Sequence, residues 1–460
     1  MDTRIGHPFR MEDEIESLYK ELNGFLHTNR ERIRYDVKQF ELEAAKTHLI
    51  YAGAPLAIGF YPLILSETQS LYISKVVEAM IRLMERTTDL FLREPRIRQA
   101  FGFGPEQIEL IEVDPGYERA IPCARFDSFF DGQGLRFSEL NTDGTAGMDG
   151  SEKIAKLFLA APTMLEFFSA HPIEVFDINS CVLQTLLDCY GQFAGGSTTE
   201  IPRIAIVDWK EARTFEEFVA FEEFCREQGY EAVVADPREL DYDGYVLSHR
   251  GLRIDIIYRR VVSGEYFERL KEVKAMTQAF RDHSVCVVGS FRSDVAFSKN
   301  IFGVAHDPRF SHFFTSEERK LVEDHVPWTL PFEDSECEYR GRRLSIVELA
   351  RNEKNRFVLK PSTLYEGRGV MLGVQTGQDE WESLIEAALK NDYILQELIP
   401  MPTMPIGLWN NEIEMQTRFI HLGEYVFGGR FCGFYCRAAD APVIDRLSKE
   451  LLIPCLVLAK

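Results

Sequence analysis

A glycine-rich turn between two strand-like segments constrains this chain more than any other feature. Residues 123–130 (CARFDSFF) and 135–141 (LRFSELN) are rich in aromatic and alternating polar residues, which is typical of β-strands. Gly132-Gln-Gly134 lies between them and suits a three-residue hairpin loop, where glycine is favoured at a positive φ. We therefore expect the two segments to pair as an antiparallel hairpin.

The turn also determines which polar side chains face one another. A three-residue loop places Asp127 opposite Glu139 and Arg125 opposite Asn141. Because side chains alternate along a strand, these four share one face of the sheet, and the apolar residues between them share the other. The hairpin is thus expected to gather two carboxylates, one amide and one guanidinium.

Two facing carboxylates require a positive charge between them. Their Cβ atoms lie about 5 Å apart, and like charges at that spacing destabilise the pair. Mg²⁺ prefers a few carboxylate or amide oxygens and takes its other ligands from water and phosphates, to which Arg also binds. The residues therefore suggest a magnesium–phosphate site. The alternative is an exposed hairpin whose charges are separated by Arg125 and solvent.

The size and charge of the chain narrow the possible classes of protein. Its 460 residues predict roughly two to four domains. They include 52 Lys and Arg against 73 Asp and Glu, which gives a net charge of −21. This field repels nucleic-acid phosphate and anionic membranes and would attract a cationic substrate. Neither nucleic acid nor membrane is an expected partner.

Cysteine usage and the N-terminal segment predict a cytoplasmic protein. The nine cysteines are scattered and odd in number, which favours a reducing compartment over a disulfide framework. The first residues are acidic and lack the apolar region of a secretory signal. The longest uncharged run, 47–66, is interrupted by Pro55 and Pro62, so we interpret it as buried core and not as a membrane span.

The first quarter of the chain is expected to be largely helical. Residues 10–46 and 68–100 carry apolar positions at helical spacing among many charged residues. The segment 108–113 (IELIEV) is then expected to be a strand.

The pattern of apolar and polar residues changes after residue 171 and again after residue 300. From 171 to 299 strands and helices alternate, which predicts a parallel α/β lobe with Rossmann-like winding. After residue 300 the pattern indicates antiparallel sheet with helices, including two long strands at 411–420 and 423–431.

A second group of residues suggests phosphate contacts. Lys360 ends an apolar strand and precedes a loop with Glu366, Gly367 and Gly369, whose backbone N–H groups can cradle phosphates. Lys299 is a lone basic residue before a glycine-containing segment. Taken alone, Lys360 is equally consistent with a solvated residue at the end of a strand. Lys299 does not by itself indicate a binding site.

The strand at 392–399 (DYILQELI) is a candidate adenine site. An adenine ring needs an apolar slot beside a backbone donor and acceptor, and a strand that leaves the core between Gln396 and Ile399 can provide both. The alternative is an ordinary buried strand.

Together these segments resemble the permuted ATP-grasp ligases. The C-terminal three quarters of the chain is most similar to glutathionylspermidine synthetase and more distantly similar to eukaryotic glutathione synthetase. In that family R-F-D is followed after a short turn by E-x-N, the spacing seen in Arg125, Asp127, Glu139 and Asn141. A lysine, a V-x-K-P strand with a glycine loop and a Y-I-L-x-E strand then follow in the same order.

The resemblance implies a role for each candidate residue. Arg125 would be catalytic and lie against the transferred phosphoryl group. Asp127, Glu139 and Asn141 would coordinate Mg²⁺, with Glu366 as a further metal or loop carboxylate. ATP would be bound at its phosphates by Lys299, Lys360, Gly367 and Gly369, and at its adenine by Gln396, Glu397 and Ile399.

The resemblance also implies an α/β (α+β) fold. It consists of an ATP-grasp domain in circularly permuted order, a Rossmann-like pre-ATP-grasp lobe and a helical N-terminal region. The implied domains are the helical region at 1–106, the first part of the ATP-grasp domain with the metal-binding hairpin at 107–170, the Rossmann-like lobe at 171–299, and the second part of the ATP-grasp domain at 300–460.

Two motifs depart from the family pattern. The glycine loop reads K-P-S-T-L-Y-E-G-R-G in place of K-P-x-x-G-R-E-G, which shifts Glu366 and Arg368. The stretch E-L-N-T-D-G-T-A replaces E-Y-N-A-D-T-P-T, which keeps the metal ligands and alters the acceptor side.

The implied activity is that of an ATP-dependent carboxylate–amine ligase that forms an amide through an acyl phosphate. Its cofactors would be ATP and Mg²⁺, and its partners a small-molecule carboxylate and an amine, with peptides and polyamines among the candidates. The alternatives are a magnesium-dependent small-molecule kinase and a non-catalytic nucleotide-binding module. The oligomeric state is left open.

Overall fold

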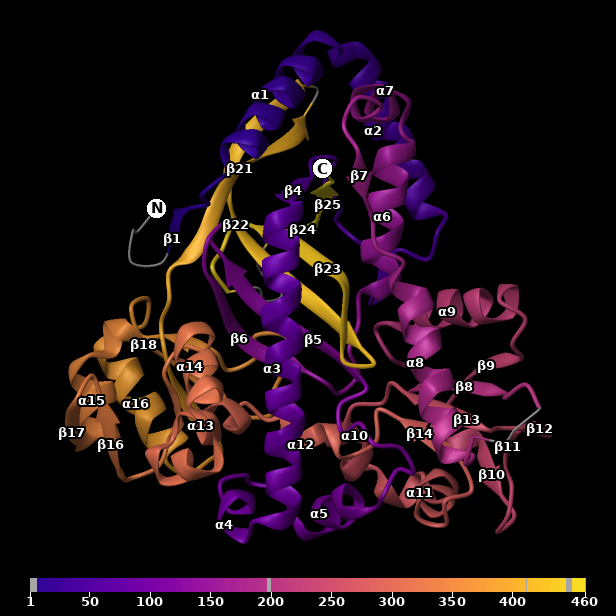
Figure 1. Cartoon of the computed structure of the whole chain (residues 1–460), viewed down its shortest axis with the longest axis vertical. Helices are drawn as coiled ribbons and strands as arrows, with labels where there is room; N and C mark the ends of the chain where they lie inside the picture. The colour runs from indigo at the N-terminus through magenta and orange to yellow at the C-terminus, as the bar shows by residue number, and fades with distance from the viewer. Residues whose placement is uncertain (1–5, 197–199, 411, 444–448, 460) are drawn as a thin grey trace.

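A seven-stranded sheet forms the centre of the molecule (Figure 1). The computed structural model describes residues 6–196, 200–410, 412–443 and 449–459. The long strand β22 (Glu412–Phe427) pairs with β23 (Arg430–Ala439) along one edge. Its other edge pairs first with β21 (Met401–Asn410) and then with β5 (Cys123–Phe130). The sheet is completed by β6 (Leu135–Asn141), β1 (Gly6–Pro8) and β24 (Glu450–Leu452).

The boundaries predicted for the two long C-terminal strands are wrong. Strand β22 continues through the gap expected between 420 and 423; residue 411, where the first strand was expected to begin, lies outside the described residues. Gly423 sits inside the strand because the Arg125 side chain fills the space beside it, with Cδ 2.9 Å from where a Cβ would lie. The turn is made by Gly428 and Gly429, whose φ values are 56° and 76°.

The predicted hairpin register is confirmed where the candidate residues lie. Asp127 is opposite Glu139, and the second expected pair also forms. The loop is one residue longer than expected, and a bulge at Ser138 on β6 restores the predicted register. The carboxylate of Asp131 stabilises this wider loop, since it accepts the N–H groups two and three positions later at 2.9 and 2.6 Å.

A long helix, α3 (Glu67–Arg93), lies across the sheet (Figure 1). Ser66 and Gln69 form a capping box at its N-terminus. Gln69 also donates from Nε2 to the carbonyl oxygen of Gly132 at 3.0 Å. The buried start of the helix therefore holds the hairpin loop in place.

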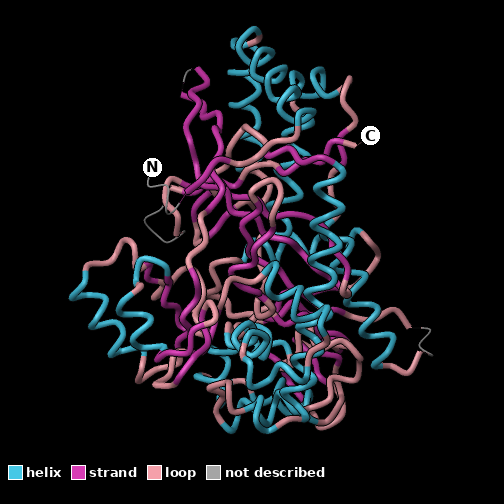
Figure 2. Tube along the Cα trace, turned by 60° about the vertical axis from the view of Figure 1, so that its left-hand side comes forward, coloured by secondary structure: helices cyan, strands magenta, loops and turns pink. Residues whose placement is uncertain are grey.

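The first two helices of the chain lie at one end of this sheet (Figure 2). The segments expected to be helical form α1 (Asp13–Thr28), α2 (Arg30–Ala45) and the helix α3. The strand expected at 108–113 is wrong: α5 (Pro105–Glu112) is a helix, because proline is well placed in a first helical turn and the buried Leu110 and Ile111 form its inner face. Within the described residues, no helix combines the length and apolarity needed to cross a bilayer.

The C-terminal strand pairs with a strand from the N-terminal quarter of the chain. Strand β4 (Leu63–Ser66) pairs in parallel with β25 (Cys455–Leu458). The remaining elements of this region are β2 (Ile50–Tyr51), β3 (Ala54–Pro55), α4 (Pro95–Arg98), α6 (Met148–Ala160), α7 (Pro162–Phe168) and β7 (Ile173–Glu174).

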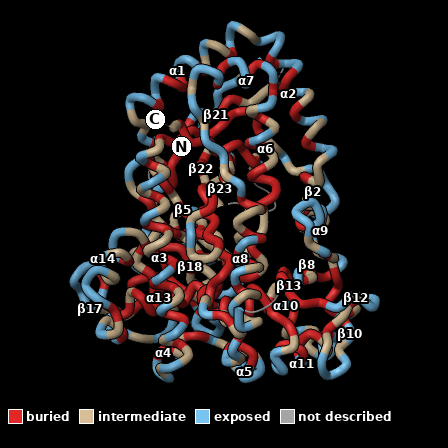
Figure 3. Tube along the Cα trace, turned by 45° about the vertical axis from the view of Figure 1, so that its right-hand side comes forward, coloured by how far each residue is buried: buried red, intermediate tan, exposed pale blue. Residues whose placement is uncertain are grey.

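The alternating segments after residue 171 form a lobe around a four-stranded parallel sheet, in the order β14-β13-β8-β9. Its strands are almost wholly buried, as the continuous apolar runs require (Figure 3). The lobe comprises α8 (Ile178–Phe193), β8 (Ile204–Val207), α9 (Phe215–Glu227), β9 (Ala232–Ala235), β10 (Leu240–Tyr242), β11 (Leu247–His249), β12 (Leu252–Arg253), β13 (Ile256–Arg259), α10 (Ser263–Glu268), α11 (Lys274–Arg281) and β14 (Cys286–Val288).

A smaller module, here called the C-terminal module, contains an antiparallel sheet in the order β15-β20-β18-β19. It has its own hydrophobic core around Trp381 and Phe357. Its elements are β15 (Thr329–Pro331), β16 (Glu336–Tyr339), β17 (Arg342–Ser345), α15 (Ile346–Asn352), β18 (Phe357–Pro361), β19 (Met371–Leu372), α16 (Gln378–Ala388) and β20 (Tyr393–Glu397). The preceding helices α12 (Ser293–Phe297), α13 (Asn300–His306) and α14 (Ser316–His325) pack into the main core.

We predict that Gly132→Ala destabilises the fold far more than Gly134→Ala. A Cβ at Gly132 would lie 1.8 Å from the carbonyl oxygen of Arg10, and φ there is +94°. At Gly134 the nearest atom is 3.6 Å away. Urea titration should show a loss of about 2–4 kcal/mol for the first variant and less than about 1 kcal/mol for the second. Equal losses would contradict this account of the loop.

Candidate functional site

The hairpin, the parallel lobe and the C-terminal module surround a cavity of about 980 Å³. This volume is at the upper end for small-molecule sites and can hold a nucleotide together with a second ligand. The predicted site residues that line it are Arg125, Asp127, Glu139, Asn141, Lys360, Glu366, Gly367, Gln396, Glu397 and Ile399. Lys299 and Gly369 do not line it, although Lys299 contacts Glu139.

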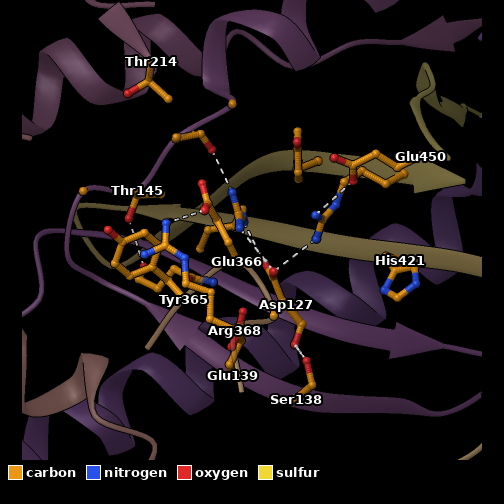
Figure 4. A pocket seen from close by; sticks show the side chains of 18 of the residues that line it. Asp127, Ser138, Glu139, Thr145, Thr214, Tyr365, Glu366, Arg368, His421 and Glu450 are labelled. Carbon is orange, nitrogen blue, oxygen red and sulfur yellow. Dashed lines mark hydrogen bonds and ion pairs between the residues drawn. The ribbon is translucent and has the colours of Figure 1, made fainter. Parts of the chain in front are cut away.

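Asp127 lies between two arginines (Figure 4). Arg125 donates to its two oxygens at 2.6 and 3.2 Å, and Arg437 donates to Oδ2 at 3.3 Å. Burial would raise the pKa of Asp127, but the two guanidinium groups hold it below its usual value. Both guanidinium groups also lie over the ring of Tyr435, at 4.8 and 5.0 Å from its centroid. The carboxylate is therefore ionised and both arginines are fixed in place.

Arg437 is a candidate that the sequence analysis missed. It lies on β23, and its second ion-pair partner is Glu450 at 3.4 Å. Its buried Nε makes no hydrogen bond within the described structure. The signal available in the sequence was weak: Tyr435 and Arg437 alternate along one strand, which places two polar groups on the same face.

Two buried lysines lie close to the other carboxylate and to the adenine strand. Lys299 Nζ is 3.3 Å from Glu139 Oε2, and the lysine is only 4% exposed. Lys360 Nζ donates to Gln396 Oε1 at 2.7 Å. Burial lowers the pKa of Lys360 to about 8; the charge of Lys299 acts in the same direction, and the carboxylates of the hairpin oppose it. Part of the Lys360 population is thus uncharged just above neutral pH.

The balance of charges suits a polyanion. The side chains of Arg125, Arg437, Lys299 and Lys360 carry four positive charges when protonated, against the three negative charges of Asp127, Glu139 and Glu450. A triphosphate would neutralise this excess, which the protein alone does not.

The hairpin also fits a magnesium ion. The Asn141 amide is buried, and its Nδ2 has no hydrogen-bond partner in the described structure. Since the two ends of an amide are assigned by their surroundings, its oxygen can equally face the cavity. Among the described residues, no three His, Cys, Asp or Glu side chains are grouped as a metal site. Two carboxylates and one amide suit Mg²⁺, which takes its other ligands from water and phosphates.

The predicted adenine strand, β20, borders the apolar part of the cavity. Gln396 and Glu397 are held within the C-terminal module: Gln396 Nε2 donates to Thr329 at 3.0 Å, and Glu397 accepts from Tyr339 at 2.8 Å. The apolar lining nearby comes from Phe129, Val358, Val370, Leu372, Leu398, Ile399 and Met401. Such a wall suits a flat aromatic ring.

Glu366 joins the glycine loop (residues 361–370) to the rest of the protein. It has a φ of +57° and accepts hydrogen bonds from Tyr51, from Arg213 at 3.0 Å and from Arg368 at 2.8 Å. Burial would raise the pKa of Glu366, but these three partners lower it. Since its oxygens face Tyr51 and the arginines here, its role as a metal ligand stays a prediction.

The loop has two further contacts. Lys299 Nζ donates to the carbonyl oxygen of Leu364 at 2.8 Å, and the Tyr365 hydroxyl donates to Glu265 at 3.1 Å. Gly369 is required by close packing, because a Cβ there would lie 2.8 Å from Pro361. The loop therefore spans from the module to the parallel lobe and covers part of the cavity.

We predict that Glu366→Gln loosens the glycine loop, because it removes the charge that pairs with Arg213 and Arg368. Hydrogen exchange across residues 361–370 should rise severalfold while the rest of the module is unchanged. Glu382→Gln, which breaks an exposed ion pair with Arg351, is the matched control. An equal response of the loop in both variants would show that Glu366 does not hold it.

Part of the chain is similar in sequence to a known protein. No family model matches the chain. The ATP-grasp enzyme ankG of Aspergillus thermomutatus is 29% identical over 156 residues, which cover 32% of this chain. The chain thus matches about a third (31%) of the length of that relative.

A solved structure shares the fold over almost the whole chain. A glutathione synthetase-like effector (GSS30) from Globodera pallida superposes with a TM-score of 0.58 at 13% identity, covering 92% of this chain and 96% of that one. A putative gamma-glutamylcysteine synthetase from Methylobacillus flagellatus gives a TM-score of 0.41 at 11% identity, over 82% of this chain and 88% of that one. The chain therefore has the fold of a glutathione synthetase-like protein, and one third of it is similar in sequence to an ATP-grasp enzyme.

Proposed function

We propose that this protein is an ATP-dependent carboxylate–amine ligase, similar to glutathionylspermidine synthetase, with the permuted ATP-grasp and Rossmann-like domains described for that family. The observation that carries the proposal is the pair of facing carboxylates, Asp127 and Glu139, set among four cationic side chains in a large cavity. This arrangement suits a metal-bound nucleotide triphosphate, and the fold and the partial sequence likeness agree with it.

In the proposed reaction a substrate carboxylate attacks the γ-phosphate of ATP and displaces ADP. The acyl phosphate is then attacked at its carbonyl carbon by an amine; a C–N bond forms, the C–O bond breaks, and phosphate leaves with the electron pair. Arg125 and Arg437 would offset the charge that develops on the transferred phosphoryl group. Holding the reactants in line removes much of the entropic barrier.

The remaining candidate residues would bind ATP and its metal. Asp127, Glu139 and Asn141 would hold Mg²⁺, which supplies charge compensation to the phosphates, with Glu366 as a further carboxylate on the loop. Lys299, Lys360, Gly367 and Gly369 would contact the phosphates, and Gln396, Glu397 and Ile399 would frame the adenine. The glycine loop would shield the acyl phosphate from water.

We predict that ADP forms only when a carboxylate and an amine are both supplied. A panel of carboxylates and amines should be assayed for phosphate release, with hydroxylamine added in a parallel series. Hydroxylamine should yield a hydroxamate, because it traps an acyl phosphate. A phosphate ester without hydroxamate would indicate a kinase, and nucleotide binding without turnover would indicate a non-catalytic module.

Glu139→Gln provides the internal control for this assay. The substitution keeps the shape of the side chain and removes one of the two facing carboxylates, so the fold should stay stable while turnover falls about 10²–10³-fold or more. Strong destabilisation with intact turnover would show that Glu139 is a structural residue.

We also predict that ATP affinity falls as pH rises through about 8. Lys360 is charged below its pKa of about 8 and neutral above it, so its attraction for phosphate is present at pH 7 and lost by pH 9. Lys360→Arg keeps its charge across this range and should remove the pH dependence. Calorimetric titration with MgATP between pH 7 and pH 9 measures this change in affinity. If ATP affinity depends on pH equally in the wild type and in Lys360→Arg, Lys360 does not bind phosphate.

A further inference from the structure

Asp208 is a buried carboxyl whose charge has no partner in the described structure. It directly follows β8, at the carboxyl end of the parallel strands, and it lines the cavity while only 9% exposed. One of its oxygens accepts the backbone N–H of Trp209 at 2.7 Å. Within the described residues its other oxygen accepts no hydrogen bond, and no Lys, Arg or His forms an ion pair with it. A buried ionised carboxylate normally requires such a partner.

Asp236, at the same position after the neighbouring strand β9, has partners for its carboxylate. Its oxygens accept hydrogen bonds from the Arg238 side chain and from the backbone N–H of Lys210 at 3.1 Å. Burial raises its pKa, but the bonds from Arg238 and Lys210 outweigh this and lower the value to about 2. Asp236 does not line the cavity. The two strand-end carboxylates thus differ in whether the protein supplies their counter-charge.

The charged side chains that act on Asp208 are Glu265, Arg260 and Asp143. Glu265, on α10, also lines the cavity, and among the described residues its carboxylate accepts a hydrogen bond from the neutral hydroxyl of Tyr365 alone. Arg260 is a cation whose charge acts on Asp208, but its guanidinium pairs with Glu217 and donates to Thr145 and Tyr258. The remaining carboxylate that acts on Asp208, Asp143, is paired with Arg259.

Burial raises the pKa of Asp208 to about 7; the Trp209 N–H and Arg260 oppose this, and the charges of Glu265 and Asp143 add to it. The free carboxyl is therefore partly protonated at neutral pH. A cation placed beside it would restore the charged form.

We propose that Asp208 and Glu265 form a subsite for an ammonium group of the amine substrate. The inference rests on the proposed ligase function and adds to it the chemical class and the location of the second substrate. An alkylammonium would give the buried carboxylate of Asp208 the ion pair it lacks. Because Tyr365 belongs to the glycine loop, the subsite lies beside the loop that would cover the phosphates.

The subsite can be tested without turnover, so its failure is separable from failure of the ligase proposal. The full-length protein, without ATP, is titrated with 1,4-diaminobutane, with n-butylamine and with n-butanol as the uncharged control. We expect the two amines to bind and butanol not to. Affinity should rise between pH 6 and pH 8, because Asp208 loses its proton while the amines stay charged, as lysine does.

Asp208→Asn should weaken amine binding by about tenfold or more, since it removes the charge that the ammonium contacts. Asp236→Asn is the matched control and should leave amine binding unchanged. If Asp208→Asn does not fold, Glu265→Gln replaces it, and a severalfold loss is expected. Equal amine affinity in the wild type and in these subsite variants, or equal binding of butanol and butylamine, would overturn the proposal.

Discussion

The pairing of strand β5 with β22 is the interaction on which the candidate site depends. It brings Asp127 and Arg125 against β22 and β23, where Arg437 and Tyr435 complete their surroundings. A buried carboxylate without these guanidinium groups would be protonated or would leave the interior. Gly423 makes the approach possible, because any larger residue would displace the Arg125 side chain. The ionised state of Asp127 therefore depends on the same strand pairing that forms the sheet.

The cavity collects charges that are only partly balanced within the protein. On the hairpin side cations exceed carboxylates, and around Asp208 carboxylates exceed available cations. Two regions of opposite sign within one cavity suit two ligands of opposite charge, brought together at one place. The glycine loop touches both regions, through Lys299 on one side and through Tyr365 and Glu366 on the other.

The sequence predicted the hairpin well because its information is local. Alternation and turn glycines were enough to pair Asp127 with Glu139, even though the loop proved longer and a bulge compensated for it. The helix at Pro105–Glu112 was missed because a short apolar run is ambiguous between strand and helix. A break was expected between 420 and 423, and only the distant Arg125, whose side chain fills the space beside Gly423, explains why the strand continues. Arg437 and Asp208 were missed because their surroundings are not visible in the local sequence. Arg437 contacts Asp127, which lies far along the chain, and Asp208 lacks a cationic partner among the described residues.

The separation between β5 and β22 has a consequence for synthesis in the cell. Ser128 and Glu424, which are hydrogen-bonded across these strands, are 296 residues apart. At ribosomal rates of about 5–20 residues per second, the first strand waits about 15–60 s for its partner. During that interval its edge is open and its charged side chains are hydrated. The nascent chain therefore emerges before its candidate site is assembled, and chaperones that cover unpaired strand edges have a defined interval in which to act.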